Sequence, residues 1–157
     1  LRDITDIQIG SVLKWLKGGN PPTKDGKVKN SYFVFLGCFK DDNDWYAILF
    51  RLTTKVSFYI QGKRKNNKSI IFQNHSCFDK DSATSDLDVH VIDADRLHKS
   101  FLNGYLNKKC SITEDELTLL NSILLTGKAI PEILKEKLGA KEVIDWIEYL
   151  NKNNFYQ

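Results

Sequence analysis

Ser31-Tyr-Phe-Val-Phe-Leu-Gly-Cys-Phe39 is an aromatic and almost wholly apolar run, as expected for a strand that is buried on both faces. A polar connection follows it, Lys40-Asp-Asp-Asn-Asp44, made of residue types that favour turns. The chain then becomes apolar again over Trp45-Tyr-Ala-Ile-Leu-Phe-Arg-Leu-Thr53. Two apolar runs joined by a short polar turn predict an antiparallel hairpin.

Four shorter segments around this hairpin also carry strand signals. The first, Gly10-Ser11-Val12-Leu13-Lys14-Trp15, is typical of a strand after a turn or of a helix end, and its spacing does not choose between them. The others are Val56-Ser-Phe-Tyr-Ile60, Ser69-Ile-Ile-Phe72 and Val89-His-Val-Ile92, which turn residues separate. Short strands at this spacing predict a small antiparallel barrel or sandwich.

Beyond Asp93 the pattern becomes helical. Thr113-Glu-Asp-Glu116 is a capping box and predicts the start of a helix that ends at Gly127. Two more helices are predicted, over Pro131–Leu138 with Gly139 as the stop, and over Ala140–Asn151. We therefore expect an α+β protein, with a β-barrel core over residues 1–110 and a helical segment over residues 111–157 packed on it.

Composition limits the class of protein. The 157 residues are 41% hydrophobic and 27% charged, which fits one globular domain and excludes wholesale disorder. No apolar run approaches the roughly 18 residues of a membrane-spanning helix, so no membrane contact is expected. The three cysteines, Cys38, Cys77 and Cys110, form no CxxC pair. We expect them to be reduced, in a cytoplasmic protein that has no structural zinc site.

Charge is unevenly distributed along the chain. Residues 1–80 hold 14 Lys+Arg and 7 Asp+Glu, a balance of +7, whereas residues 81–157 hold 9 and 13, a balance of −4. A basic half suggests a cationic face for a polyanion, and the alternative is a chance grouping of solvent-facing lysines. The basic positions gather in two loops, with Lys24, Lys27 and Lys29 in the first and Lys63, Arg64 and Lys65 in the second.

Arg51-Leu52-Thr53-Thr54-Lys55 is the most informative local signal. In an extended segment residues i and i+2 point to the same face, so Arg51 and Thr53 would present a guanidinium beside a hydroxyl. This pair suits phosphate, because the Arg fork binds it in a bidentate manner and the Thr donates another hydrogen bond. The alternative is that Arg51 lies at the strand edge with its guanidinium in solvent, and that Thr53 is present only because Thr favours strands.

Other candidate catalytic groups are isolated in the sequence. The three histidines form neither an HxH nor an HExxH pattern, so neither a metal nor another cofactor is expected. Cys77 lies two residues after His75 and would be either an activated thiol or a partly buried thiol near an unrelated histidine. The sequence favours the second interpretation.

Several short motifs occur in the order found in one toxin family. Gly10-Ser11-Val12-Leu13 is similar to an opening G-D-I-V/L strand, and Arg51-Leu-Thr-Thr54 to a strand end P-I-T-S. Val89-His-Val-Ile-Asp-Ala-Asp-Arg-Leu97 is similar to I-R-T-I-D-K-x-R-L. Asn103-Gly-Tyr-Leu106, followed by Thr113-Glu-Asp-Glu-Leu117, is similar to G-x-L-s-x-e-e-l. Over residues 9–125 the chain thus resembles the MazF/PemK (Kid/CcdB superfamily) toxins of bacterial toxin–antitoxin systems.

This resemblance implies an SH3-like barrel, usually homodimeric, that cleaves single-stranded RNA without a metal. In that reaction the ribose 2′-hydroxyl attacks the adjacent phosphate and leaves a 2′,3′-cyclic phosphate and a 5′-hydroxyl. The family's Thr and the Ser after it fall on Thr53 and Thr54. A cognate antitoxin is the expected protein partner. The expected RNA contacts are Lys24, Lys27, Thr54, Lys55, Lys63, Arg64 and Lys65.

One departure from the family concerns the catalytic Arg, which the family carries in R-P before its second strand. Asn30-Ser31-Tyr32 stands there in this chain, so Lys29 or Lys27 would replace the Arg, as a point charge rather than a fork. Arg51 stands where the family has Pro and would return a guanidinium to the site. His75 is a further candidate, as a general acid.

A second hypothesis is a catalytically silent module on the same barrel, which would hold nucleic acid or a protein. Loss of the loop Arg favours this hypothesis, and the Thr-Thr strand end favours the enzyme. Residues 127–157 extend beyond the family's usual end. They would either cap the barrel or present an apolar stripe to an antitoxin or a second protomer.

Overall fold

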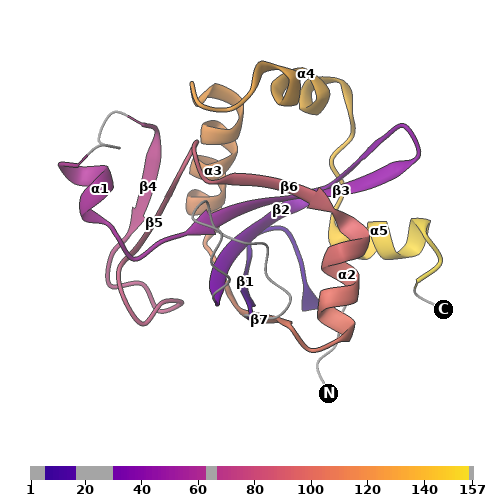
Figure 1. The fold of residues 1–157 in the computed structure, drawn as a ribbon, viewed down its shortest axis with the longest axis horizontal. Helices are drawn as coiled ribbons and strands as arrows, with labels where there is room; N and C mark the ends of the chain where they lie inside the picture. Colours follow the sequence, from indigo (N-terminus) through magenta and orange to yellow (C-terminus); the bar gives the residue numbers. More distant parts are fainter. Residues whose placement is uncertain (1–5, 17–29, 63–66, 156–157) are drawn as a thin grey trace.

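The computed structural model describes residues 6–16, 30–62 and 67–155, which form an α+β protein (Figure 1). Five antiparallel strands form the main sheet in the order β6-β3-β2-β1-β7. They are β1 (Ser11–Trp15), β2 (Ser31–Asp41), β3 (Asp44–Leu52), β6 (Val89–Asp93) and β7 (Leu106–Ser111). A small second sheet pairs β4 (Ser69–Phe72) with β5 (Ser82–Ser85). The helices are α1 (Ser57–Ile60), α2 (Ala94–Leu102), α3 (Glu114–Thr126), α4 (Glu132–Ala140) and α5 (Trp146–Lys152).

The hairpin of β2 and β3 is confirmed. Lys40 pairs with Trp45 and Asp41 with Asp44, so the turn comprises Asp42 and Asn43. Asp42 has a φ of 55°, a left-handed conformation that Asp tolerates better than most residues. Both strands are almost continuously apolar because side chains from other elements cover both of their faces.

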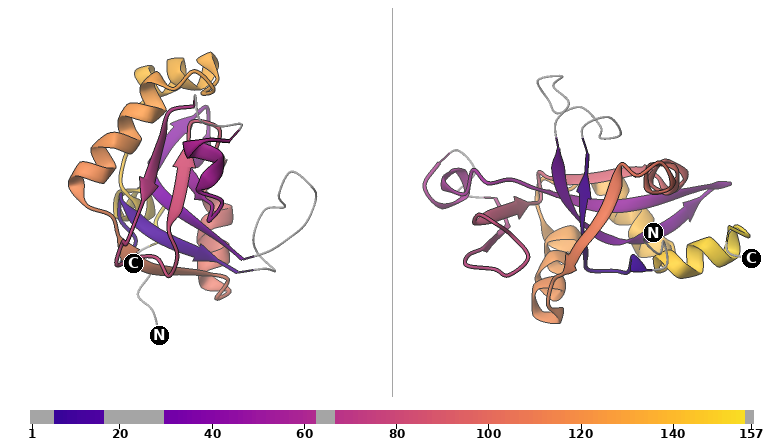
Figure 2. Two further views of the ribbon diagram at one scale, coloured as in Figure 1. Left: turned by 90° about the vertical axis from the view of Figure 1, so that its left-hand side faces the viewer. Right: turned by 90° about the horizontal axis from the view of Figure 1, so that it is seen from below.

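The two faces of the sheet carry two hydrophobic cores. The first core holds Phe33, Phe35 and Leu49 together with residues of α2 and α5, among them Leu97 and Trp146. The second core holds Val34, Ile48 and Phe50 of the same strands, with Phe72 of β4 and with Leu120, Ile123 and Leu124 of α3. Strand alternation explains the division, since neighbouring residues of a strand point to opposite faces. Figure 2 shows α2 and α3 on different sides of the strands.

A β-bulge at Gly37 makes room for the segment just before α5 to pair with β2. The register with β3 shifts between Phe35 and Gly37, and Gly37 has a φ of 122°. A Cβ on Gly37 would lie 2.5 Å from Val143 Cγ1, because Cys38 and Ile144 exchange two backbone hydrogen bonds of 2.8 Å next to it. Glycine is therefore required by close approach as well as by conformation.

Three predictions about the β-structure need correction. Within the described residues no closed barrel forms: the two sheets stay separate and are joined by one isolated bridge between Thr53 and Ala83. Residues 56–60 are expected to be a strand, but Ser57–Ile60 form the short helix α1 with Val56 as its N-cap, since a short apolar run fits either state. Strands β5 and β7 were not expected, because β5 has no large apolar residue and β7 is largely polar.

The helix boundaries match the prediction closely for α3 and less closely for α4 and α5. The capping box is confirmed: the Thr113 hydroxyl accepts from the Glu116 N–H, and the Glu116 carboxylate accepts from the Thr113 N–H. Helix α4 continues through Gly139 to Ala140. The last helix begins at Trp146 and not at Ala140, because Ile144 pairs with β2 and Asp145 caps α5 by accepting from the Trp146 N–H. In the described part of the chain, no helix is long and apolar enough to cross a membrane.

The expectation of three reduced cysteines is wrong for two of them. Cys77 and Cys110 form a disulfide that ties the loop between β4 and β5 to strand β7. Cys77 is therefore no activated thiol. Cys38 is buried and free, and burial raises the pKa of its thiol far above the usual value, so it acts as an apolar residue.

We expect substitution of Cys77 by Ser to lower the free energy of unfolding by about 2–4 kcal/mol, because the disulfide closes a loop between residues 33 positions apart. Urea denaturation measures this loss. A thiol reductant should lower the midpoint of the wild type to that of the variant and leave the variant unchanged. An unchanged wild-type midpoint under reductant would contradict the prediction.

Candidate nucleic-acid site

Arg51 lies near the end of β3, where its guanidinium packs on an aromatic ring. It pairs with Phe33 of β2, and its Cζ lies 5.1 Å from the centroid of the Phe33 ring. The backbone N–H of Arg51 donates to the backbone carbonyl of Asp88. Partial burial lowers the pKa of Arg51, and the nearby Asp88 carboxylate opposes this shift. A guanidinium stays charged in any protein environment, so the site holds a fixed, half-buried positive charge.

His90 contacts the same ring from the neighbouring strand. In β6 it pairs with Leu49, which places it on the face of the first core. Its imidazole meets the Phe33 ring edge-on, with centroids 5.9 Å apart and an interplanar angle of 89°. Arg51 and His90 thus flank one phenyl ring. His90 is not among the site residues predicted from the sequence, although its alternation with Val89 and Val91 already places it on the other face of β6 from them.

A second cation extends this group. Trp15 of β1 packs edge-on against Phe33 at 5.7 Å, and the Cζ of Arg96 lies 5.8 Å from the centroid of the Trp15 ring. Arg96 is exposed and stands in the first turn of α2, which follows β6 without a gap. We call these five residues, Arg51, His90, Phe33, Trp15 and Arg96, the Phe33 cluster. It presents two guanidiniums and an imidazole over a buried aromatic pair.

Thr53 lies one residue beyond β3 and joins the two sheets. Its N–H donates to Ala83 O at 2.9 Å, and its carbonyl accepts from Ala83 N at 2.8 Å. The Thr53 hydroxyl accepts from the Lys55 N–H at 3.2 Å, which leaves its own proton for another acceptor. Thr54 and Lys55 are exposed, and Lys55 Nζ lies 5.6 Å from the Phe58 ring. Strand alternation puts Thr53 on the side of Arg51, two residues along.

His75 belongs to another part of the molecule. Its Nε2 lies 2.9 Å from Glu116 Oε1, and its Nδ1 accepts from the Cys77 N–H at 3.0 Å. Its ring packs against both Phe72 and Phe78 on the side of the second core. Both ring nitrogens therefore have partners, and their role here is to hold the loop of the disulfide against α3.

Glu116 connects this histidine to the cap of α3. Burial disfavours the charged form of Glu116 and tends to raise its pKa. The hydrogen bonds from Thr113 and His75 outweigh this effect of burial, so the pKa of the carboxyl is lowered. Because the pKa of Glu116 is lowered on folding, its hydrogen bonds stabilise the folded protein fully at a pH above 4.5, the usual pKa. This contribution to stability is lost as the pH falls through the lower pKa of the folded protein.

We expect Glu116→Ala to lower the free energy of unfolding by about 1–2 kcal/mol at pH 7 and by less at pH 3. Denaturation at several pH values measures the loss. Glu114→Ala, in the same exposed first turn, is the control and should cost little. A loss that stays constant from pH 7 to pH 3 would contradict the assignment.

The predicted basic-loop residues, Lys24, Lys27, Lys29, Lys63, Arg64 and Lys65, lie outside the described residues. Among those that are described, no group of three His, Cys, Asp or Glu side chains could hold a metal ion. Each guanidinium of the Phe33 cluster can bind an anion, and the imidazole can exchange a proton. Comparison with protein-family models gave no match, and comparison with curated proteins gave none either.

Proposed function

We propose that this protein is a metal-independent endoribonuclease that cleaves single-stranded RNA. The observation that carries the proposal is that Arg51 and His90, from neighbouring strands, both contact the Phe33 ring. Transesterification at a phosphate needs a charge to stabilise the extra negative charge and a group that moves a proton, and these two side chains supply both.

Each residue has a separate task in this reaction. His90, in its neutral form, takes the proton of the 2′-hydroxyl as that oxygen attacks the phosphorus. Arg51 donates two hydrogen bonds to the non-bridging oxygens, whose charge grows in the transition state. The bond to the 5′-oxygen breaks, and this oxygen takes a proton from solvent. Thr53 donates its hydroxyl proton to the phosphate, and Arg96 holds the neighbouring phosphate.

The biological role proposed here is that of a bacterial toxin of the MazF/PemK kind, with an SH3-like fold, a cognate antitoxin and a homodimeric state. The order of the motifs in the sequence and the five antiparallel strands support it. Lys24, Lys27, Thr54, Lys55, Lys63, Arg64 and Lys65 are proposed to guide the RNA backbone. A cytoplasmic site of action follows from this substrate.

The experiment is incubation with single-stranded RNA of mixed sequence in excess EDTA, followed by a denaturing gel. Fragments that appear at a rate proportional to protein concentration support the enzyme. RNA that stays intact on the gel, but that the protein retains in a filter-binding assay with a steep dependence on salt, would overturn it in favour of a silent binding module. The departure from the family's loop Arg is what favours that second function.

A further inference from the structure

Asp88 is the cross-strand neighbour of Arg51 and stands just before β6. In the register of β3 and β6, Phe50 pairs with Val89. One step further, the backbone N–H of Arg51 donates to the backbone carbonyl of Asp88 at 2.9 Å. Opposed residues of an antiparallel pair project to the same face of a sheet. The carboxylate of Asp88 therefore lies on the face that carries the Arg51 guanidinium.

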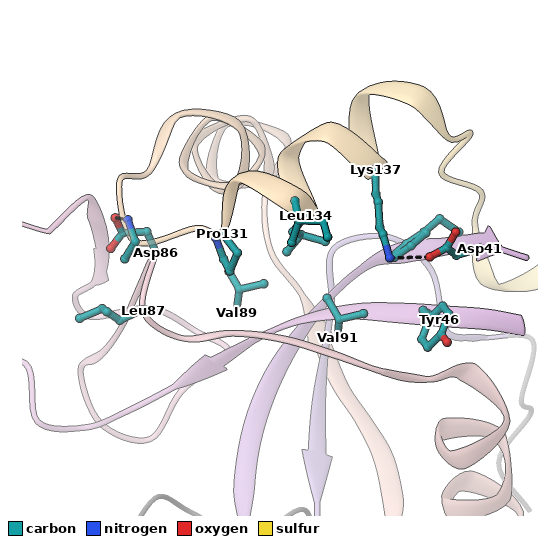
Figure 3. Close-up of a pocket in the computed structure, with 12 residues that line it drawn as sticks. Asp41, Tyr46, Asp86, Leu87, Val89, Val91, Pro131, Leu134 and Lys137 are labelled. Carbon is teal, nitrogen blue, oxygen red and sulfur yellow. Dashed lines mark hydrogen bonds and ion pairs between the residues drawn. The ribbon is translucent and has the colours of Figure 1, made fainter.

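A groove between α4 and β6 marks the opposite face of the sheet (Figure 3). Val89 and Val91 line this groove and point toward α4. Asp88 and His90 alternate with these two valines, so their side chains lie on the other face, which is that of the Phe33 cluster. A carboxylate, an imidazole and the guanidinium of Arg51 thus share one face at this end of the sheet.

Two buried hydroxyls hold the Asp88 carboxylate in place. The Tyr59 hydroxyl of α1 donates to Asp88 Oδ2 at 2.6 Å, and the Ser85 hydroxyl of β5 donates to the same oxygen at 2.8 Å. Both Tyr59 and Ser85 are buried. The backbone N–H of Asp88 also donates to the Ser85 carbonyl at 3.0 Å. Helix α1 and the second sheet therefore fix the position of this carboxylate.

The charge of Asp88 acts on the guanidinium of Arg51. Partial burial lowers the pKa of Arg51, and attraction to the Asp88 carboxylate opposes that lowering. The guanidinium also packs on the Phe33 ring, with its Cζ 5.1 Å from the ring centroid. A fixed carboxylate and an aromatic ring thus act together on its orientation. Because a guanidinium has five N–H donors, it can serve a carboxylate and a phosphate at the same time.

We infer that Asp88 is a positioning residue, which holds the Arg51 guanidinium toward the phosphate that is cleaved. The inference rests on the proposed RNA cleavage, and it gives Asp88 a role through Arg51 rather than in contact with the RNA. Donors that are already oriented stabilise a transition state without reorganisation at the moment of reaction. Tyr59 and Ser85 contribute one step further out, since they fix Asp88.

Asp88→Asn is the first test, because it keeps the shape of the side chain and removes its charge. Loss of a negative charge favours RNA binding, so the affinity for RNA should stay unchanged or increase. The cleavage rate at saturating RNA should nevertheless fall about 10- to 100-fold, since a misplaced guanidinium no longer matches the transition state. In the Arg51→Ala background, Asp88→Asn should cause no further loss, because Asp88 acts through Arg51.

Tyr59→Phe removes one of the two hydroxyls and should slow cleavage less than Asp88→Asn does. Tyr46→Phe is the matched control and should cleave at the wild-type rate, because Tyr46 lines the groove on the opposite face. Thermal melts confirm that the variants are folded. An undiminished rate in Asp88→Asn would overturn the inference. So would an equal loss from Asp88→Asn with and without Arg51, since Asp88 would then act independently.

A second readout does not depend on cleavage. Nitrogen NMR of the isotope-labelled protein reports rotation of the Arg51 guanidinium, whose signal is assigned by its loss in Arg51→Lys. The guanidinium should rotate slowly in the wild type and several-fold faster in Asp88→Asn. Equal rotation in both would overturn the inference. If the wild type cleaves no RNA, the proposed function fails, and this comparison still decides whether Asp88 holds Arg51.

Discussion

Alanine in place of His90 should slow the cleavage of single-stranded RNA by about 10²–10⁴-fold, the effect expected when a proton-transfer group is lost. The reason is that His90 is the imidazole that lies against the ring shared with Arg51. The measurement is the single-turnover rate of fragment formation in EDTA. Binding of uncleaved RNA should change by less than about threefold, because the variant keeps Arg51 and Arg96, the proposed phosphate contacts.

Substitutions of the neighbouring groups separate charge from proton transfer. Arg51→Ala should lower the rate by about 10²–10³-fold, and Arg51→Lys should recover only part of it because the fork is lost. Thr53→Ala should have a smaller effect, since one hydrogen bond is removed. His75→Gln is the matched control and should cleave at the wild-type rate, because both His75 nitrogens already have partners. Undiminished rates in Arg51→Ala and Thr53→Ala together would remove both residues from the mechanism.

Replacement of Trp146 by alanine should lower the free energy of unfolding by about 3–5 kcal/mol, the largest loss of stability that we expect from one substitution. Trp146 is completely buried in the first core, where it packs edge-on against Phe35 at 6.0 Å and beside Tyr149 at 4.9 Å. It is the first residue of α5, so its removal weakens the packing of the last helix on the sheet that carries Arg51.

Ile147→Ala is the matched control, since Ile147 is the next residue of the same helix and is 40% exposed. It should change the free energy of unfolding by less than about 1 kcal/mol. Urea denaturation with fluorescence detection measures both variants. A similar small loss for both would mean that α5 adds little to the core, against the packing described above.

The sequence was most informative where one rule applied without competition. The hairpin of β2 and β3 could be predicted because two long apolar runs flank a polar turn. The capping box at Thr113 could be predicted because both of its hydrogen bonds are local. Strand β5 could not, since its residues are Ser-Ala-Thr-Ser and it is buried by its surroundings rather than by its own hydrophobicity. Strand β7 is polar because it lies at the edge of the sheet.

Much of the candidate site depends on contacts between distant segments. Arg51 could be predicted as a site residue from the residues next to it in the chain. His90 could be recognised only from the pairing of β3 with both β2 and β6. The link between Cys77 and Cys110 likewise joins a loop to a strand that the sequence did not predict. In both cases the missing information was which distant segments lie side by side, and local patterns do not carry it.

The most direct test of the central claim is the mass of the RNA ends that the protein produces in excess EDTA, with a fully 2′-deoxy oligonucleotide of the same sequence as the control. The account predicts 2′,3′-cyclic phosphate and 5′-hydroxyl ends from the RNA, an intact deoxy strand, and neither product with His90→Ala. Cleavage of the deoxy strand, 5′-phosphate ends, or equal cleavage by His90→Ala would contradict it.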